Sequence, residues 1–178
     1  MSSIEKIPLR SPQGGYNVVV ETPRGSRVKF AYESESGLFR VKKLLAIGFA
    51  FPWAFGFFPS TLAEDGDPLD VLILTELDLP TGALVRCGII GGIAVKEIES
   101  DQAQTLRNDR LLGVPLFRHQ DRPPRVLSDL PQAELKDLED FLVGYQAADG
   151  KVVQIVGRLD KFEAEAALDV AARRSIGH

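Results

Sequence analysis

The chain has 178 residues, a net charge of −4 at pH 7 and a hydrophobic fraction of 44%. These values are typical of a soluble globular protein, and we expect one domain over residues 1–178. The acidic balance argues against binding to nucleic acid or to a membrane surface. No segment reaches the roughly 18 apolar residues of a membrane span. With one cysteine, Cys87, and no apolar leader, the chain is expected to be cytoplasmic.

Short β-like segments dominate the first two-thirds of the chain. Residues 16–21 are rich in β-branched side chains and end before a proline. Residues 27–32 and 38–42 alternate apolar and polar side chains around a Ser-Gly turn, which predicts a hairpin-like pair with one half-buried face. The aromatic segment 49–58 is interrupted by proline and glycine and predicts irregular packing or short strands.

Three further strands are predicted over residues 69–74, 84–96 and 110–117. The second is long, and its glycines at 88, 91 and 92 would allow bends or bulges. The polar segments 97–108 and 119–124 are predicted to be loops.

Two helices are expected in the last third. The first carries an apolar stripe and would be capped by Ser128 or Asp129, with Gly150 beyond its end; the stripe is Leu135, Leu138, Leu142 and Tyr145.

Residues 151–159 predict a last strand. Asp160 and Glu163 then resemble the capping box of a second helix, whose apolar face would be Phe162, Ala166 and Val170. Many short strands and two late helices predict a mainly β fold with flanking helices (α+β), built on a closed or nearly closed β-barrel.

The most informative segment is residues 64–70, Glu-Asp-Gly-Asp-Pro-Leu-Asp, which runs straight into an apolar strand. The glycine and the proline shape a turn from which Asp65, Asp67 and Asp70 would converge. Crowded carboxylates repel one another unless a cation neutralises them. Without histidine or cysteine nearby, the oxygen ligands suit a hard ion such as Mg²⁺. A solvated acidic turn is the alternative.

The run Asp65-Gly66-Asp67-Pro68-Leu69-Asp70 matches the Asp-x-Asp-Pro-x-Asp signature of family I soluble inorganic pyrophosphatases. Other segments match in order and at about the family spacing, at residues 20–23, 28–30, 35–37, 85–87, 113–115 and 130–131. The chain resembles this family over nearly its whole length. The resemblance implies a five-stranded barrel of oligonucleotide-binding (OB) type with flanking helices. It also implies hydrolysis of pyrophosphate with several Mg²⁺ ions, Mn²⁺ as a substitute, and a homo-oligomer, with a hexamer favoured.

The resemblance further implies roles for single residues. Asp65, Asp67 and Asp70 would hold the metal ions, and Asp67 would also be the general base toward the attacking water. Lys29 and Tyr145 match family groups that bind substrate.

Other matching positions carry changed residues. Lys43 stands where the family has a phosphate-binding arginine, and it lacks the bidentate fork of that side chain. Glu21 would support the edge of the site, and Phe55 fills the space of a family tyrosine without its hydroxyl. Ala31 replaces a family glutamate and Gln146 a lysine.

The family has a second acidic stretch, Asp, four residues, Asp, one residue, Lys. Its lysine falls on Arg110, a substrate-binding residue by resemblance, and its second aspartate falls on Asn108. A shift of one residue would use Asp109 instead, and we take Asp109 as a metal ligand. The first aspartate falls in a longer loop in which Glu97, Glu99 and Asp101 compete; Asp101 is taken as the ligand.

These changes affect substrate and metal contacts, whereas the first acidic motif is intact. A second interpretation therefore stays open. The chain would then be a divergent member of the fold with weak or no pyrophosphatase activity, acting on another phosphate compound or as a binding or assembly subunit.

Overall fold

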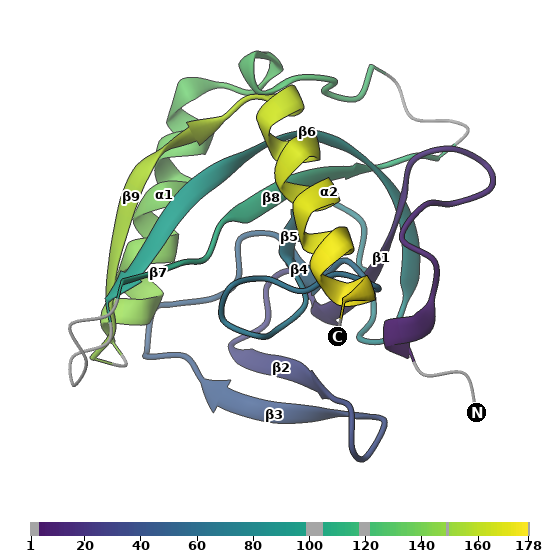
Figure 1. Cartoon of the computed structure of the whole chain (residues 1–178). Coiled ribbons are helices and arrows are strands. Elements are labelled where there is room, and N and C mark those ends of the chain that lie inside the picture. Colours follow the sequence, from purple (N-terminus) through teal and green to yellow (C-terminus); the bar gives the residue numbers. More distant parts are fainter. Residues whose placement is uncertain (1–3, 99–104, 118–121, 149, 178) are drawn as a thin grey trace.

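The computed structural model describes residues 4–98, 105–117, 122–148 and 150–177. Figure 1 shows the strands gathered into one body, with the β2–β3 hairpin set apart from the other strands. In chain order the elements are η1 (Ile4–Lys6), β1 (Tyr16–Thr22), β2 (Val28–Glu33), β3 (Leu38–Leu44), β4 (Ala54–Phe57), β5 (Asp70–Ile73), β6 (Leu84–Ile98), β7 (Thr105–Arg107), β8 (Arg110–Pro115), η2 (Leu127–Asp129), α1 (Gln132–Ala147), β9 (Val152–Leu159) and α2 (Lys161–Ile176).

Five strands form a closed ring. β1 pairs with β4, β4 with β5, β8 with β6, and β6 again with β1, all antiparallel, while β5 and β8 run parallel. The long β6 closes the ring at one end and pairs with β9 beyond it. The predicted mainly β fold with flanking helices and a five-stranded closed core is confirmed, and the hairpin predicted in residues 27–42 is the separate β2–β3 sheet.

Glycines allow the strands of the ring to approach closely. A Cβ atom on Gly56 would lie 2.2 Å from the carbonyl oxygen of Val19 on the neighbouring strand. The pairing of β6 with β8 is irregular between Ile89 and Gly91, and Gly91 has a φ of 155°. The bend predicted from the glycines of this strand is therefore present.

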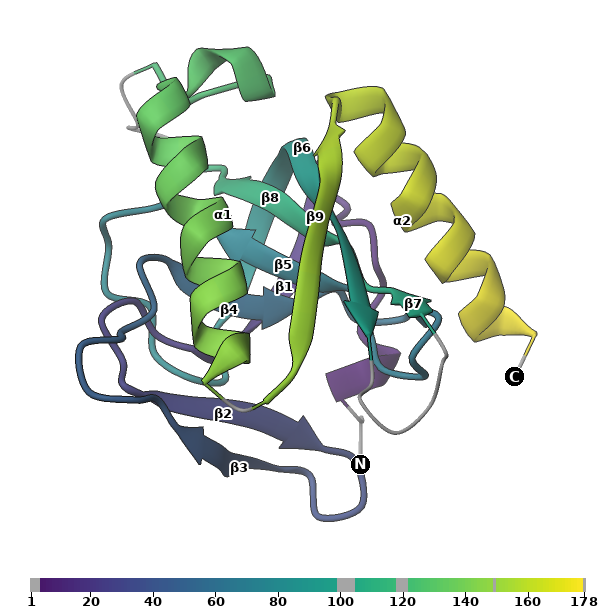
Figure 2. The same ribbon diagram turned by 90° about the vertical axis from the view of Figure 1, so that its left-hand side faces the viewer.

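Side chains from the two faces of the ring pack into two separate apolar clusters. Val71 and Ile73 of β5 lie in the cluster that includes the buried side of α2. Leu72, between them, lies in the cluster that includes the stripe of α1. In Figure 2 the two helices lie on either side of β9. None of the helices in the described ranges is both long and apolar enough to cross a membrane.

The stripe predicted for α1 is buried, but the predicted cap is wrong. Ser128 and Asp129 belong to η2, and Pro131 precedes α1 without a side-chain cap. The Asp129 carboxylate instead accepts hydrogen bonds from the backbone N–H groups of Arg125 and Val126. The short η2 turn uses this carboxylate before α1 begins.

For α2 the capping box is confirmed, because Asp160 accepts from the Glu163 N–H and Glu163 accepts from the Asp160 N–H. The predicted apolar face is wrong: Phe162 is 80% exposed and Val170 is 47% exposed. The buried face consists of Ala164, Leu168 and Ala171. Small side chains let the helix pack directly against β6, and this contact decides which face is buried.

The segment predicted as a loop over residues 97–108 is partly a strand. β6 extends to Ile98, and β7 pairs with its end, with Lys96 opposite Arg107. Its polar composition suggested a loop, but pairing with an existing strand overrides that preference. Part of this segment, residues 99–104, lies outside the described residues, and so do residues 119–121 of the loop predicted over 119–124.

Candidate active site

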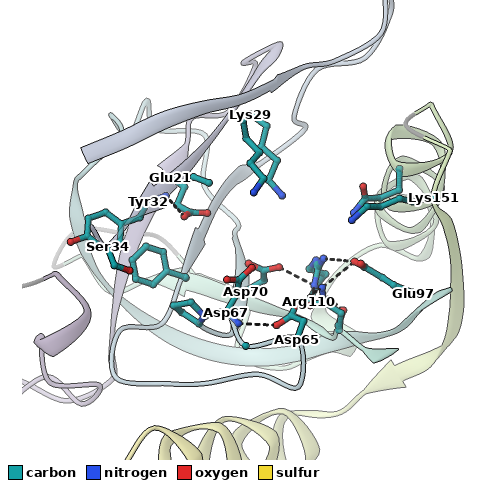
Figure 3. A pocket seen from close by; sticks show the side chains of 17 residues that line it. Glu21, Lys29, Tyr32, Ser34, Asp65, Asp67, Asp70, Glu97, Arg110 and Lys151 are labelled. Atoms are coloured by element: carbon teal, nitrogen blue, oxygen red, sulfur yellow. Dashed lines mark hydrogen bonds and ion pairs between the residues drawn. The ribbon is translucent and has the colours of Figure 1, made fainter. Parts of the chain in front are cut away.

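A cavity of about 310 Å³ lies where the β2–β3 hairpin faces the acidic loop 64–70 (Figure 3). It collects charged side chains from elements that are far apart in the sequence. Acidic and basic groups line it together, which suits an anion that binds with metal cations. The charged residues lining it are Glu21, Lys29, Lys42, Asp65, Asp67, Asp70, Glu97, Arg110 and Lys151.

The acidic loop is held by local hydrogen bonds. The Asp65 carboxylate accepts from the Asp67 N–H at 3.1 Å, and Gly66 has a φ of 89°, which favours glycine. Thr61 fixes the start of the next strand by accepting from the Leu69 N–H at 2.9 Å. The loop therefore presents all three predicted aspartates to the cavity.

Behind the loop, the side chains of Arg110, the first residue of β8, and of Asn108, just before that strand, join the carboxylates. Arg110 Nη1 lies 2.9 Å from Asp70 Oδ2, and Arg110 Nη2 lies 3.0 Å from Glu97 Oε1. Asn108 Nδ2 donates to Asp65 Oδ2 at 2.9 Å and to Glu97 Oε1 at 3.0 Å. Arg110 also donates to Asn108 Oδ1.

The carboxylates are held in a partly dehydrated environment. Burial raises the pKa of Asp65 and of Asp70, and the Arg110 guanidinium opposes the rise for both. Glu21 is buried, and burial raises its pKa to about 7 although its Oε1 accepts the Tyr32 N–H at 2.8 Å. Bringing a cation into the cavity would favour the charged forms.

Lys29 points into the cavity as expected, with its Nζ 5.0 Å from the centre of the Phe55 ring. Lys43 does not line the cavity. Its Nζ lies 4.6 Å from the centre of the Tyr145 ring and donates to Gln146 Oε1 at 3.4 Å, and burial lowers its pKa to about 8.

The neighbouring Lys42 lines the cavity instead. The register explains the exchange, because Lys29 pairs with Lys43 whereas Phe30 pairs with Val41, so Lys42 is the extra residue at a β-bulge. A bulge re-aims the side chains of its strand. Regular alternation could not reveal this change.

Tyr145 and Phe55 lie beneath the site. Tyr145 is 1% exposed, stacks on Phe141 with ring centres 4.9 Å apart, and its hydroxyl has no hydrogen-bond partner among the described residues. The fully buried Phe55 ring lies below Lys29 and 5.8 Å from the Arg110 guanidinium. The structure thus places Tyr145, predicted to bind substrate, outside the cavity lining.

The structure also separates Asp109 from the cavity. Asp109 Oδ1 accepts from the Val95 N–H at 3.0 Å and from Arg107 Nε at 2.5 Å. Asn108 and Arg110 face the cavity because alternate residues of an extended chain point to opposite sides. Of the two residues that the sequence left in competition, the structure places Asn108 in the cavity lining and Asp109, the one expected to bind metal, outside it.

Three acids, Glu97, Glu99 and Asp101, competed for the first position of the second acidic stretch. The structure places Glu97 in the cavity lining. Asp101 and Glu99 lie outside the described residues. Sequence reasoning also missed Lys42 and Lys151. Lys151 directly precedes β9, a position that could have marked it as a residue at a strand end.

The donor set fits a hard divalent cation in its chemistry, because it consists of carboxylate oxygens without histidine or cysteine. Within the described ranges, no three such side chains are already arranged as a metal site. In the described part of the chain the Asp67 carboxylate accepts no hydrogen bond, although its backbone carbonyl accepts from the Ala63 N–H at 2.8 Å, and the residue is exposed to the cavity. Its carboxylate is therefore available to a ligand.

A closed β-ring carries a cavity in which an acidic loop faces lysines, a combination that suits an anion bound together with metal cations. The family model for inorganic pyrophosphatase matches residues 18–175, so the chain belongs to the inorganic pyrophosphatase family. An inorganic pyrophosphatase from Sulfolobus acidocaldarius is 34% identical over 162 residues, which cover 90% of this chain and 91% of that protein. One from Gluconobacter oxydans is 36% identical over 151 residues, covering 83% and 84%.

The structural comparison agrees with the sequence comparison. The crystal structure of an inorganic pyrophosphatase from Thermus thermophilus matches with a TM-score of 0.88 at 26% identity. The match covers 98% of this chain and 99% of that chain. One from Neisseria gonorrhoeae matches with a TM-score of 0.86 at 29% identity, over 97% and 98% of the two chains.

Proposed function

We propose that the protein hydrolyses inorganic pyrophosphate to two orthophosphates and uses Mg²⁺, with Mn²⁺ as a substitute. One observation carries the proposal: three aspartates from one loop face the same cavity as lysines from three other segments. Family membership supports the same activity. Pyrophosphate is small and highly charged, and it needs both metal ions and fixed cations around it.

The residues divide the work. Asp65, Asp67 and Asp70 would hold magnesium ions, which when bound would polarise the phosphoanhydride and increase the acidity of water. Asp67 is the proposed general base and accepts a proton from the attacking water through its unbonded carboxylate. Lys29 and Lys151 neutralise the phosphoryl oxygens from two sides of the cavity.

Lys42 takes the place in substrate binding that the sequence assigned to Lys43. Lys43 contributes from beside the cavity, and Tyr145 and Phe55 support its floor. Glu21 holds β2 near its C-terminal end by accepting a hydrogen bond from the Tyr32 N–H. Arg110 holds the Asp70 and Glu97 carboxylates in position through ion pairs, so its charge is not free to bind the substrate.

We also propose that the protein is a cytoplasmic homo-oligomer, with a hexamer favoured. Large apolar side chains on the surface support self-association: Leu44 is 65% exposed, Ile47 93% and Ile176 87%. Sedimentation equilibrium at micromolar protein should give a mass several times the 19.5 kDa of one chain. A monomer at every concentration would contradict this part of the proposal.

The activity is tested by phosphate release from pyrophosphate. Release should require Mg²⁺ and should fall at least about 100-fold in Asp67→Asn, because the amide cannot take the proton. Asp78→Asn is the matched control, since Asp78 is exposed and does not line the cavity. No release above buffer from folded wild-type protein would reject the proposal. It would favour the divergent binding or assembly subunit.

A further inference from the structure

Arg110 is a buried cation in the middle of the acidic residues. Its side chain is 4% exposed, and its two terminal nitrogens contact Asp70 at 2.9 Å and Glu97 at 3.0 Å. Figure 3 shows the guanidinium between these two carboxylates. A buried charge is tolerated only when it is paired and hydrogen-bonded, and Arg110 meets both conditions.

Asn108 extends the contact to a third carboxylate. Its amide donates to Asp65 at 2.9 Å and to Glu97 at 3.0 Å, while its oxygen accepts from Arg110. Asn108, just before β8, and Arg110, the first residue of β8, therefore bridge carboxylates from the acidic loop, the start of β5 and the end of β6. The oxygens Asp65 Oδ2, Asp70 Oδ2 and Glu97 Oε1 already receive protein donors.

The other side of the acidic loop is different. Asp67 is exposed to the cavity and, in the ranges the structure describes, its carboxylate accepts no recorded hydrogen bond. The carboxylates thus form two groups. The neutralised set consists of Asp65, Asp70 and Glu97, each of which has an oxygen in contact with Asn108 or Arg110. Asp67 stands apart from this set, and its carboxylate is open to the cavity.

We propose that Arg110 acts as a built-in cation and, together with the hydrogen bonds of Asn108, excludes a divalent metal ion from the space between Asp65, Asp70 and Glu97. The inference rests on the proposed function. It restricts the metal ions that serve the reaction to the Asp67 side of the loop, where Asp65 and Asp70 could take part only through the carboxylate oxygens that Asn108 and Arg110 do not contact. A metal ion could enter the neutralised set only by displacing a buried guanidinium from its two carboxylates, which would leave that charge unpaired.

Manganese binding measured by equilibrium dialysis tests the proposal in solution. The double variant Asn108→Asp/Arg110→Ala adds a carboxylate and removes the cation, and it should bind one more Mn²⁺ per chain than the wild type. Arg107→Ala is the control, because Arg107 bonds to Asp109 and does not line the cavity; its Mn²⁺ count should equal that of the wild type. An unchanged count in the folded double variant would overturn the inference.

A crystal of the wild-type protein soaked in Mn²⁺ provides a second test, which locates the bound metal directly and needs no variant. The anomalous map should show manganese at Asp67 and none between Asp65, Asp70 and Glu97. A peak between those three residues, in protein that still cleaves pyrophosphate, would overturn the inference and leave the proposed function standing. No manganese at the loop and no cleavage would overturn both.

Discussion

Glu21 illustrates what a single buried carboxyl does in this site. Burial raises its pKa to about 7 from an ordinary value of 4.5, so the folded chain binds this proton more tightly than the unfolded chain. The stability it contributes is complete below about pH 4.5 and is lost as the pH rises through about 7. Without divalent metal, the protein should therefore be less stable at pH 8 than at pH 5.

Replacing the Glu21 carboxyl by an amide should remove the free-energy cost of burying a charged carboxylate at high pH. Glu21→Gln should gain stability over wild type at pH 8, on the order of 3 kcal/mol, and gain little at pH 4. Urea denaturation at the two pH values, in the presence of a chelator, measures the difference. Asp137→Asn, on the exposed side of α1, is the control and should show no such pH-dependent gain. An equal effect of Glu21→Gln at both pH values would contradict the raised pKa.

Individual site residues were predictable where local chemistry fixes them. Asp65, Asp67 and Asp70 were found because three carboxylates crowded in one turn repel one another unless a cation neutralises them. The exchange of Lys43 for Lys42 was not predictable, and the sequence left the choice between Asn108 and Asp109 open. These two outcomes depend on a β-bulge and on the phase of alternation in β8, and a shift of one residue reverses the direction of a side chain.

At the scale of single elements, α2 combines a predictable beginning with an unpredictable face. The capping box at Asp160 and Glu163 follows from sequence because it involves only neighbouring residues. The buried face was misassigned because Phe162 and Val170 are larger apolar residues than the Ala164 and Ala171 that contact the ring. Close packing against β6 selects small side chains, and periodicity alone does not carry that information.

The cap should make a measurable contribution to stability. Asp160→Ala removes the acceptor for the Glu163 N–H at 2.9 Å, and it should lower the free energy of unfolding by about 1 kcal/mol. Thermal unfolding followed by circular dichroism is a suitable measurement. Asp140→Ala is the comparison, because that residue forms an exposed ion pair with Lys136 within α1 and should cost about 0.5 kcal/mol or less. A larger loss for Asp140→Ala than for Asp160→Ala would argue against the capping role.

At the scale of the whole molecule, the closed ring places the site. It brings β1, β5, β6 and β8 together, and each contributes a charged residue to the cavity. The strands and the barrel class followed from short alternating segments and from the family resemblance. The pairing of β7 with β6 did not follow, because a polar strand of three residues acquires its structure only from its neighbour.

Closure of the ring requires glycine at position 56. Gly56→Ala should lower the free energy of unfolding by about 2 kcal/mol or more, because the new methyl group would lie 2.2 Å from the Val19 carbonyl oxygen and force β1 and β4 apart. Gly177→Ala is the matched control, since its Cβ would meet only ordinary contacts of 3.7 Å or more. Chemical denaturation of both variants gives the comparison, and similar stabilities would contradict the proposed tight approach of the strands.

The central claim is that this cavity cleaves pyrophosphate with a divalent metal. Phosphorus NMR of pyrophosphate mixed with the wild-type protein and Mg²⁺ follows substrate and product together. The pyrophosphate resonance should disappear while orthophosphate appears in a ratio of two per molecule consumed, and a chelator should stop the change. A pyrophosphate resonance that stays constant beside folded, Mg²⁺-saturated protein would contradict the account.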